Sequence, residues 1–306
     1  MVFKMSNIFK RMPLGISGLL LAILSLGNIL YDYHRDVKIL TCLLGILIIF
    51  ILLVKIIFYR NDVVNDLRNP VIASTSGTFS MALILLSTYI YPINQSIALF
   101  VWILGVLLHI LLICYFTMMF VLSNFDIDNV YGSYWVVYVG ITMAAITGGI
   151  IKLGSISWIF FVFGFCMMIP TFILITYRYF KYPVKNEANK PLICIYTALF
   201  SILITGYLHS FNDINMEFLM ILYVIACICY VFSTYKLVSY IRMPFYPTFS
   251  AFTFPFVISV IASNEVLKTT GENIFLQIFI YYQLLVAVII VIYVLFKYIE
   301  KYLISR

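Results

Sequence analysis

The stretch RMPFYPTFSAFTFPFVISVIASNEVLK, residues 242–268, decides the fold. It is apolar enough to span a bilayer, yet Pro255 lies near its middle. A proline there has no N–H to bond the carbonyl four residues back, which is that of Ala251. A freed carbonyl is costly in hydrocarbon unless it faces protein, water or an ion. The sequence therefore predicts a helix kink at Pro255 beside a polar environment.

The phenylalanines of this stretch fall into two sets. At about 100° per residue, Phe249, Phe252 and Phe256 lie in one narrow stripe, whereas Phe254 points roughly 140° away from Phe249. The stripe is typical of helix packing, and our hypothesis is that Phe254 faces and plugs a pore. On the residues alone, an ordinary aromatic contact between helices is the more common interpretation of such a residue. The face of Phe254 is shared by Ser250, Val257 and Ile261.

The amino-acid composition indicates that most of the chain is surrounded by lipid and not by water. The chain has 306 residues, of which 64% are hydrophobic and only 10% are charged, whereas a soluble domain has about 25% charged residues. We expect an integral membrane protein in a lipid bilayer, organised as a single transmembrane channel domain over residues 1–306. The net charge of +7 would suggest nucleic acid in a soluble protein, but the basic residues flank apolar runs. We expect them to set topology and expect no nucleic-acid partner.

The apolar runs predict ten membrane spans, since a span needs roughly 20 apolar residues. Only helices or closed barrels cross lipid, and these runs are too long and continuous for barrel strands, so the fold class is all-α. Only four of the 19 Lys and Arg residues fall on one side of the predicted membrane, namely Arg35, Lys38, Lys152 and Lys268. This bias predicts a multi-pass cell-membrane protein with both termini in the cytoplasm. The spans are residues 12–31, 38–58, 70–91, 97–121, 131–151, 155–177, 190–209, 216–239, 247–267 and 274–298.

Odd and even spans differ in composition. The odd spans are rich in Gly, Pro, Ser and Thr, while the even spans are nearly uniform Leu, Ile, Val, Phe and Tyr. Small and hydroxyl residues permit close helix packing or line a wet cavity. We infer five helical hairpins, each with one polar inner helix and one apolar outer helix, around a central pore. A solid bundle whose small residues only allow tight packing is the alternative, and the sequence does not separate the two.

The spans offer little reactive chemistry. No Asp, Glu, Lys or Arg lies near the centre of any span, the six cysteines lie within apolar runs, and His109 is best explained as a hydrogen-bonded packing residue. No zincin, serine-hydrolase or nucleotide-binding motif occurs. We therefore expect no enzyme activity, no cofactor and no metal. A pore lined by hydroxyls and aromatic rings, without rings of carboxylates, suits small anions better than cations.

Four stretches resemble a known family of membrane proteins. They are PLGISGLLLAILSLGN (13–28), NPVIASTSGTFSMALILLSTY (69–89), KPLICIYTALFSILITGYL (190–208) and FSAFTFPFVISVIA (249–262). They are similar to the first, third, seventh and ninth spans of the tellurite-resistance/dicarboxylate transporter family, which includes the bacterial TehA proteins and the plant slow anion channels. One departure is Ala198-Leu199, where the family usually has Ala-Pro.

The resemblance implies ten helices in five hairpins around a pore, a gating phenylalanine at the position of Phe254, and a homotrimer with one pore per subunit. It also places Gly18 at the pore-facing glycine of the first span. We expect small inorganic or organic anions to pass Phe254, with Gly18, Gly77, Gly140 and Gly206 leaving room around its ring. The alternative function is a proton-linked secondary transporter of C4-dicarboxylates or of oxyanions such as malate, sulfite or tellurite.

Overall fold

The computed structural model describes residues 8–31 and 34–304 of the chain. All regular structure within these ranges is helical, and they contain no strand. The inner helices are α2 (Ile16–Leu30), α5 (Pro70–Ile90), α7 (Ser133–Tyr138), α8 (Thr142–Gly148), α10 (Tyr196–Ser210) and α12 (Phe254–Thr270). The outer helices are α3 (Arg35–Phe58), α6 (Gln95–Phe116), α9 (Ser157–Lys181), α11 (Met216–Tyr240) and α13 (Ile274–Ile299), and the short α4 (Arg60–Leu67) follows α3.

Shorter helical turns extend or connect these elements. Four are 3-10 turns, η2 (Ile127–Asn129), η3 (Gly154–Ile156), η4 (Glu187–Ile195) and η5 (Pro247–Phe252). Two are π-helical, η1 (Thr117–Ser123) and η6 (Glu300–Ile304). Asparagine side chains cap several helix starts by accepting backbone N–H bonds, as an N-cap residue does. These caps are Asn69 for α5, Asn94 for α6, Asn215 for α11 and Asn273 for α13.

The contacts between the inner helices form a closed ring. Helix α2 packs against α5, α5 against α7 and α8, α8 against α10, and α10 against α12, which returns to α2. Each inner segment also packs against the outer helix that follows it in the chain. The predicted all-helical fold, with an inner ring of helices covered by outer helices, is therefore confirmed.

Burial separates the inner from the outer helices as their composition predicts. In the apolar windows of three inner segments, which contain α5, α10 and α12, between 67% and 94% of residues are buried. In the outer helices the corresponding share is 28–39%. The outer faces left exposed carry Leu, Ile, Phe and Val, which is the surface that lipid would cover.

The number of membrane-crossing helices is less regular than predicted. Eight described helices are long and apolar enough to cross a membrane, and they correspond to eight of the ten predicted spans. The other two spans contain shorter helices. Helix α2 has 15 residues, of which thirteen are buried, and the span 131–151 is broken into α7 and α8. Because these segments lie inside the protein, their backbone need not satisfy itself against lipid.

The break in the fifth predicted span has a local cause. The chain turns at Gly140 between α7 and α8, where the N–H groups of Val139 and Gly140 both bond the carbonyl of Trp135. A Cβ placed on Gly140 would lie 2.2 Å from the carbonyl oxygen of Val136. Only glycine fits this turn, so the predicted span 131–151 consists of two short helices joined at this point.

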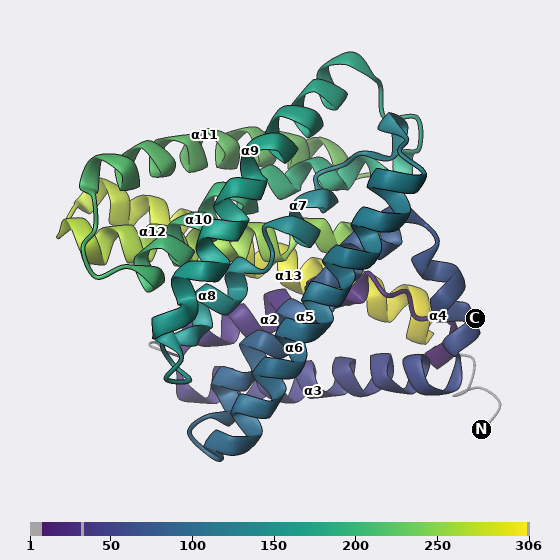
Figure 1. Cartoon of the computed structure of the whole chain (residues 1–306), viewed down its shortest axis with the longest axis horizontal. Coiled ribbons are helices and arrows are strands. Elements are labelled where there is room, and N and C mark those ends of the chain that lie inside the picture. The colour runs from purple at the N-terminus through teal and green to yellow at the C-terminus, as the bar shows by residue number, and fades with distance from the viewer. Residues whose placement is uncertain (1–7, 32–33, 305–306) are drawn as a thin grey trace.

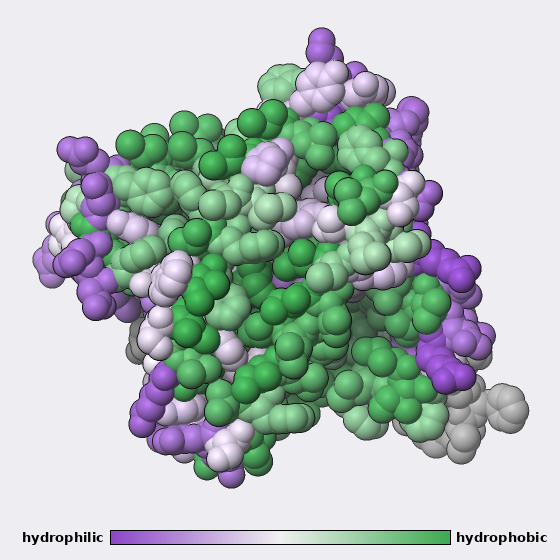
Figure 2. All heavy atoms as spheres, viewed as in Figure 1, coloured by the Kyte–Doolittle hydropathy of each residue, from purple (hydrophilic) through white to green (hydrophobic). Residues whose placement is uncertain are grey.

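The surface supports a membrane location. Figure 2 shows a broad apolar surface across the middle of the molecule, with hydrophilic residues gathered at its left and right ends. This is the distribution expected of a protein that spans a bilayer, with its polar ends in water. The ion pair between Lys10 and Asp62 (3.8 Å) places the start of the described chain beside α4, at the same end of the molecule as η6 (Figure 1).

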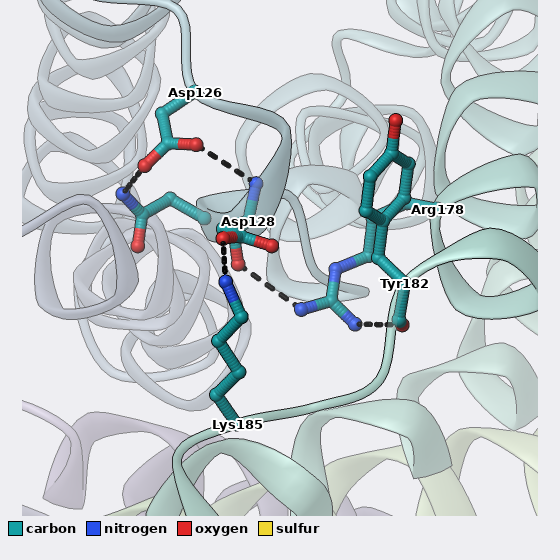
Figure 3. A network of polar contacts seen from close by, with 6 residues as sticks. Asp126, Asp128, Arg178, Tyr182 and Lys185 are labelled. Atoms are coloured by element: carbon teal, nitrogen blue, oxygen red, sulfur yellow. Dashed lines mark hydrogen bonds and ion pairs between the residues drawn. The ribbon is translucent and has the colours of Figure 1, made fainter.

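A polar network joins two loops at one end of the bundle (Figure 3). Arg178, near the end of α9, is fully buried and donates to the carbonyls of Asp128 (3.1 Å) and Tyr182 (3.3 Å). Its guanidinium also lies over the rings of Tyr131 (4.5 Å) and Tyr179 (5.3 Å). The segment between η1 and α7 is thereby fixed against the loop that follows α9.

Candidate functional site

The ninth predicted span is broken rather than kinked. The turn η5 ends at Phe252, Thr253 has φ −93° and ψ −81°, and α12 begins at Phe254. Pro255 therefore stands in the first turn of α12, where its missing N–H would have had no helical partner. The Thr253 hydroxyl donates to the carbonyl of Ser250 (2.7 Å) and lies 3.3 Å from that of Gly18. The predicted kink becomes a full break at Thr253, two residues before Pro255, and the Thr253 side chain bonds two backbone carbonyls beside it.

The break lies beside a small cavity within the ring of inner helices. The cavity has a volume of about 50 Å³ and is lined by residues of α2, α5, α7, η4, α10, η5 and α12, and by the turn at Gly140. Phe254 is 5% exposed and forms part of this lining. Gly18, Gly140, Ser250 and Pro255 line it as well. The structure thus brings Phe254 and these four predicted residues together.

The other predicted lining residues lie outside this cavity. A Cβ on Gly77 would contact Leu112 and Val136, and a Cβ on Gly206 would lie 2.2 Å from Cγ2 of Thr142. Both glycines therefore permit close helix packing, which is the second use of small residues in membrane helices. Val257 and Ile261 are not part of the lining either.

The aromatic stripe beside Phe254 is packing, as its spacing indicated. Phe249, Phe252 and Phe256 are fully buried. Phe249 packs against Phe252 at 5.0 Å between ring centroids, and Phe256 packs against Tyr230 at 5.4 Å. None of the three lines the cavity.

The cavity lining combines apolar side chains with a few hydroxyls. Thr75, Thr78 and Ser250 contribute hydroxyl groups, and Trp135 contributes an indole ring. The lining contains no Asp, Glu, Lys, Arg, His, Tyr or Cys among the described residues. An uncharged, narrow and mainly apolar passage admits ions poorly unless it widens and becomes wet.

A much larger vestibule adjoins this cavity at the end of the molecule that bears α4. Its volume is about 530 Å³, and Thr75 and Ser250 line both spaces. Asparagines 69, 186 and 189 and the backbone around Pro247 form part of its wall. The two shared residues mark the point where a wide polar mouth meets the narrow cavity.

The vestibule has more positive than negative side chains. Lys10 pairs with Asp62 at 3.8 Å, and Lys55, which is buried, donates to Asp66 (2.8 Å) and to the carbonyl of Met12 (2.7 Å). Arg11 also lines the vestibule and has no carboxylate partner within the described ranges. An excess of one positive charge at a mouth favours the approach of anions over cations.

His109 lies away from both spaces. It is fully buried in α6, with Nδ1 at 2.7 Å from the Ser80 hydroxyl and Nε2 at 3.0 Å from the carbonyl of Val137. The ring therefore ties α6 to α5 and α7, as expected of a packing residue.

Two features were not foreseen from the sequence. In the sequence, Trp135 has the pattern of an ordinary core aromatic, because its place in the lining depends on the turn at Gly140. Helix α4, which forms part of the vestibule with Asp62 and Asp66, lies in a stretch too short and polar to predict a span. The apolar residues Val63, Val64 and Leu67, which share one face at helical spacing, were a signal for it.

The fold and the site together define a class of protein: a polytopic helical membrane protein whose inner helices enclose a narrow, uncharged cavity behind a polar mouth. The chain matches the model of the voltage-dependent anion channel family (SLAC1) over residues 8–299 and therefore belongs to that family. No curated protein sequence matches the chain significantly. The match supports anions as the transported class and a multi-pass membrane location.

Proposed function

We propose that the chain is a passive channel for small anions and that the ring of Phe254 closes its pore. The observation that carries this proposal is the position of Phe254, which lines the narrow cavity at the break before α12. The vestibule meets the same cavity at Thr75 and Ser250. An anion entering from the vestibule would meet the constriction formed by this ring.

The small size and mainly apolar lining of the cavity suit closure of the pore by steric blocking and by loss of water. A single water needs about 10–15 Å³ of such volume, so about 50 Å³ holds a few waters at most. A mainly apolar constriction of this size opposes the passage of a hydrated ion, and widening it lowers the barrier steeply. Removing the benzyl group of Phe254 would enlarge the cavity.

The proton-linked transporter is less well supported. Coupled transporters usually keep an ionisable residue at membrane depth along the pathway, and the described lining of the cavity has none. His109 is committed to hydrogen bonds with Ser80 and Val137. Both termini in the cytoplasm and a homotrimer with one pore per subunit complete the proposal, with the vestibule as the cytoplasmic mouth.

The experiment that tests the proposal is anion flux into proteoliposomes. Phe254→Ala should raise nitrate and chloride flux severalfold or more over the wild type. The matched control is Phe256→Leu, compared with Phe254→Leu, since Phe256 is equally aromatic and buried but packs against Tyr230. Equal flux through wild type, Phe254→Ala and Phe254→Leu, at equal protein incorporation, would refute the gate.

A further inference from the structure

Trp135 is a buried hydrogen-bond donor without an acceptor. It lies in α7, is 2% exposed and lines the central cavity. No acceptor within the described residues lies in hydrogen-bonding range of its Nε1. Buried polar groups are nearly always paired, so an unpaired donor in a native site calls for a reason.

Another buried tryptophan of the chain shows the usual arrangement. Trp102 in α6 is 3% exposed and donates from Nε1 to the hydroxyl of Thr147 at 2.9 Å. The fold therefore satisfies this indole where it serves packing. Of these two buried tryptophans, only the one that lines the cavity lacks an acceptor among the described residues.

The Trp135 ring is held in place by side chains that do not line the cavity. Tyr196 packs against it edge to face at 4.6 Å, and Phe172 stacks at 6.4 Å. Its Cζ3 atom lies 3.5 Å from where a Cβ on Gly132 would sit, so its benzo edge faces that turn. These contacts fix the direction of the N–H, as a preorganised binding site requires.

The hydroxyl protons of the lining are already in use. Thr75 donates to the carbonyl of Val71 (2.8 Å) and Thr78 to that of Thr75 (2.8 Å). Ser250 donates to the carbonyl of Pro247 (3.0 Å). The Thr78 hydroxyl also lies 2.7 Å from that of Ser17. None of the three hydroxyls therefore has a proton free for an anion, whereas Trp135 Nε1 has one.

We propose that the Trp135 Nε1–H binds the permeating anion directly at the constriction and sets which anions pass. This proposal rests on the proposed function, because it assigns the donor within that same pathway. The first residue of α12, Phe254, also lines the cavity, so the positive end of a 17-residue helix adds to the attraction. The site has no charged side chain, and this absence determines which anions it prefers.

The preferred ligand is a small, weakly hydrated, singly charged anion such as nitrate or iodide. One neutral donor and a helix terminus cannot replace the hydration shell of a multiply charged anion in an apolar space of about 50 Å³. Sulfate and C4-dicarboxylates should therefore bind far more weakly than nitrate. Chloride, which is more strongly hydrated than iodide, should lie between them.

The test uses two independent measurements on the full chain. The first is anomalous diffraction from crystals of the wild type grown in iodide, which should show a peak within hydrogen-bonding distance of Trp135 Nε1. The second is nitrate conductance as a function of concentration in the Phe254→Ala background. Adding Trp135→Phe should raise the half-saturating nitrate concentration on the order of tenfold, since a hydrogen bond to a charged group is lost.

Two further variants separate the lost donor from changed packing. Replacing Trp135 with 3-benzothienylalanine puts sulfur in place of the N–H at nearly the same shape and should act like Trp135→Phe. Trp102→Phe, in the same Phe254→Ala background, also loses an indole N–H but should leave the half-saturating concentration unchanged.

The outcomes distinguish this site from the gate. If Phe254→Ala does not raise flux but iodide lies against Trp135, the gate is refuted and the anion site stands. If Phe254→Ala conducts, but both Trp135 variants saturate at the parent concentration and no iodide lies at Nε1, the site is overturned and the gate stands.

Discussion

Replacing Arg178 with leucine should destabilise the folded protein strongly. The substitution removes two hydrogen bonds from a charged group, to the carbonyls of Asp128 and Tyr182, each worth roughly 1.5–3 kcal/mol. It also removes the cation–π contact with Tyr131, worth about 0.5–2 kcal/mol. Relief of the cost of burying the guanidinium, whose Nε has no acceptor among the described residues, offsets part of this loss.

The net loss should be about 2–4 kcal/mol once that offset is included. For a chain of this size, each kcal/mol lowers the melting temperature by about 2 °C, so Arg178→Leu should melt about 4–8 °C below the wild type. Thermal unfolding of the purified protein in detergent, followed by intrinsic fluorescence, measures the shift.

Lys185 provides a control on the same partner residue. Its Nζ lies 2.5 Å from the carboxylate of Asp128, but the lysine side chain is 72% exposed, so solvent screens the pair. Asp128 raises the pKa of Lys185 by accepting its hydrogen bond. A raised lysine pKa means that the charged lysine contributes fully at neutral pH and that this contribution is lost as the pH rises through that pKa. Lys185→Ala should hardly change the melting temperature at pH 7, whereas an equal shift in both variants would refute the distinction by burial.

Two other substitutions probe the inner ring. Gly140→Ala should greatly reduce the yield of folded protein or its melting temperature, because the new Cβ would lie 2.2 Å from the Val136 carbonyl oxygen; normal yield and stability would contradict the tight turn. His109→Leu should cost about 2–4 kcal/mol by leaving the Ser80 hydroxyl and Val137 carbonyl without this partner, yet it should not alter how anion flux depends on a pH gradient. Loss of a pH-driven component of uptake in that variant would favour a coupled transporter.

The spacing of the apolar runs and the residue composition of each span were enough to predict the architecture. The contrast between polar odd spans and apolar even spans arises because only inner segments can hold glycine, proline and hydroxyl residues away from lipid. The same contrast appears as buried inner and exposed outer helices. The different directions of Phe254 and Phe256, which both lie in α12, could also be read from the helical period.

What the sequence could not provide are features that depend on the contacts of single residues. Gly77 and Gly206 have the same composition signal as Gly18, but only the packing of their neighbours shows that they serve helix contacts. The breaks at Gly140 and Thr253 depend on carbonyl positions, which periodicity does not encode. Trp135 became a candidate only when its lining position and unpaired donor were both known.

The most direct test of the central claim is anion conductance as a function of side-chain size at residue 254. Phe254→Leu, Phe254→Ala and Phe254→Gly should give stepwise higher single-channel or macroscopic anion currents in planar bilayers, because each step removes more of the ring that narrows the cavity. Currents that stay at the wild-type level across the whole series, with the protein folded and incorporated, would contradict it.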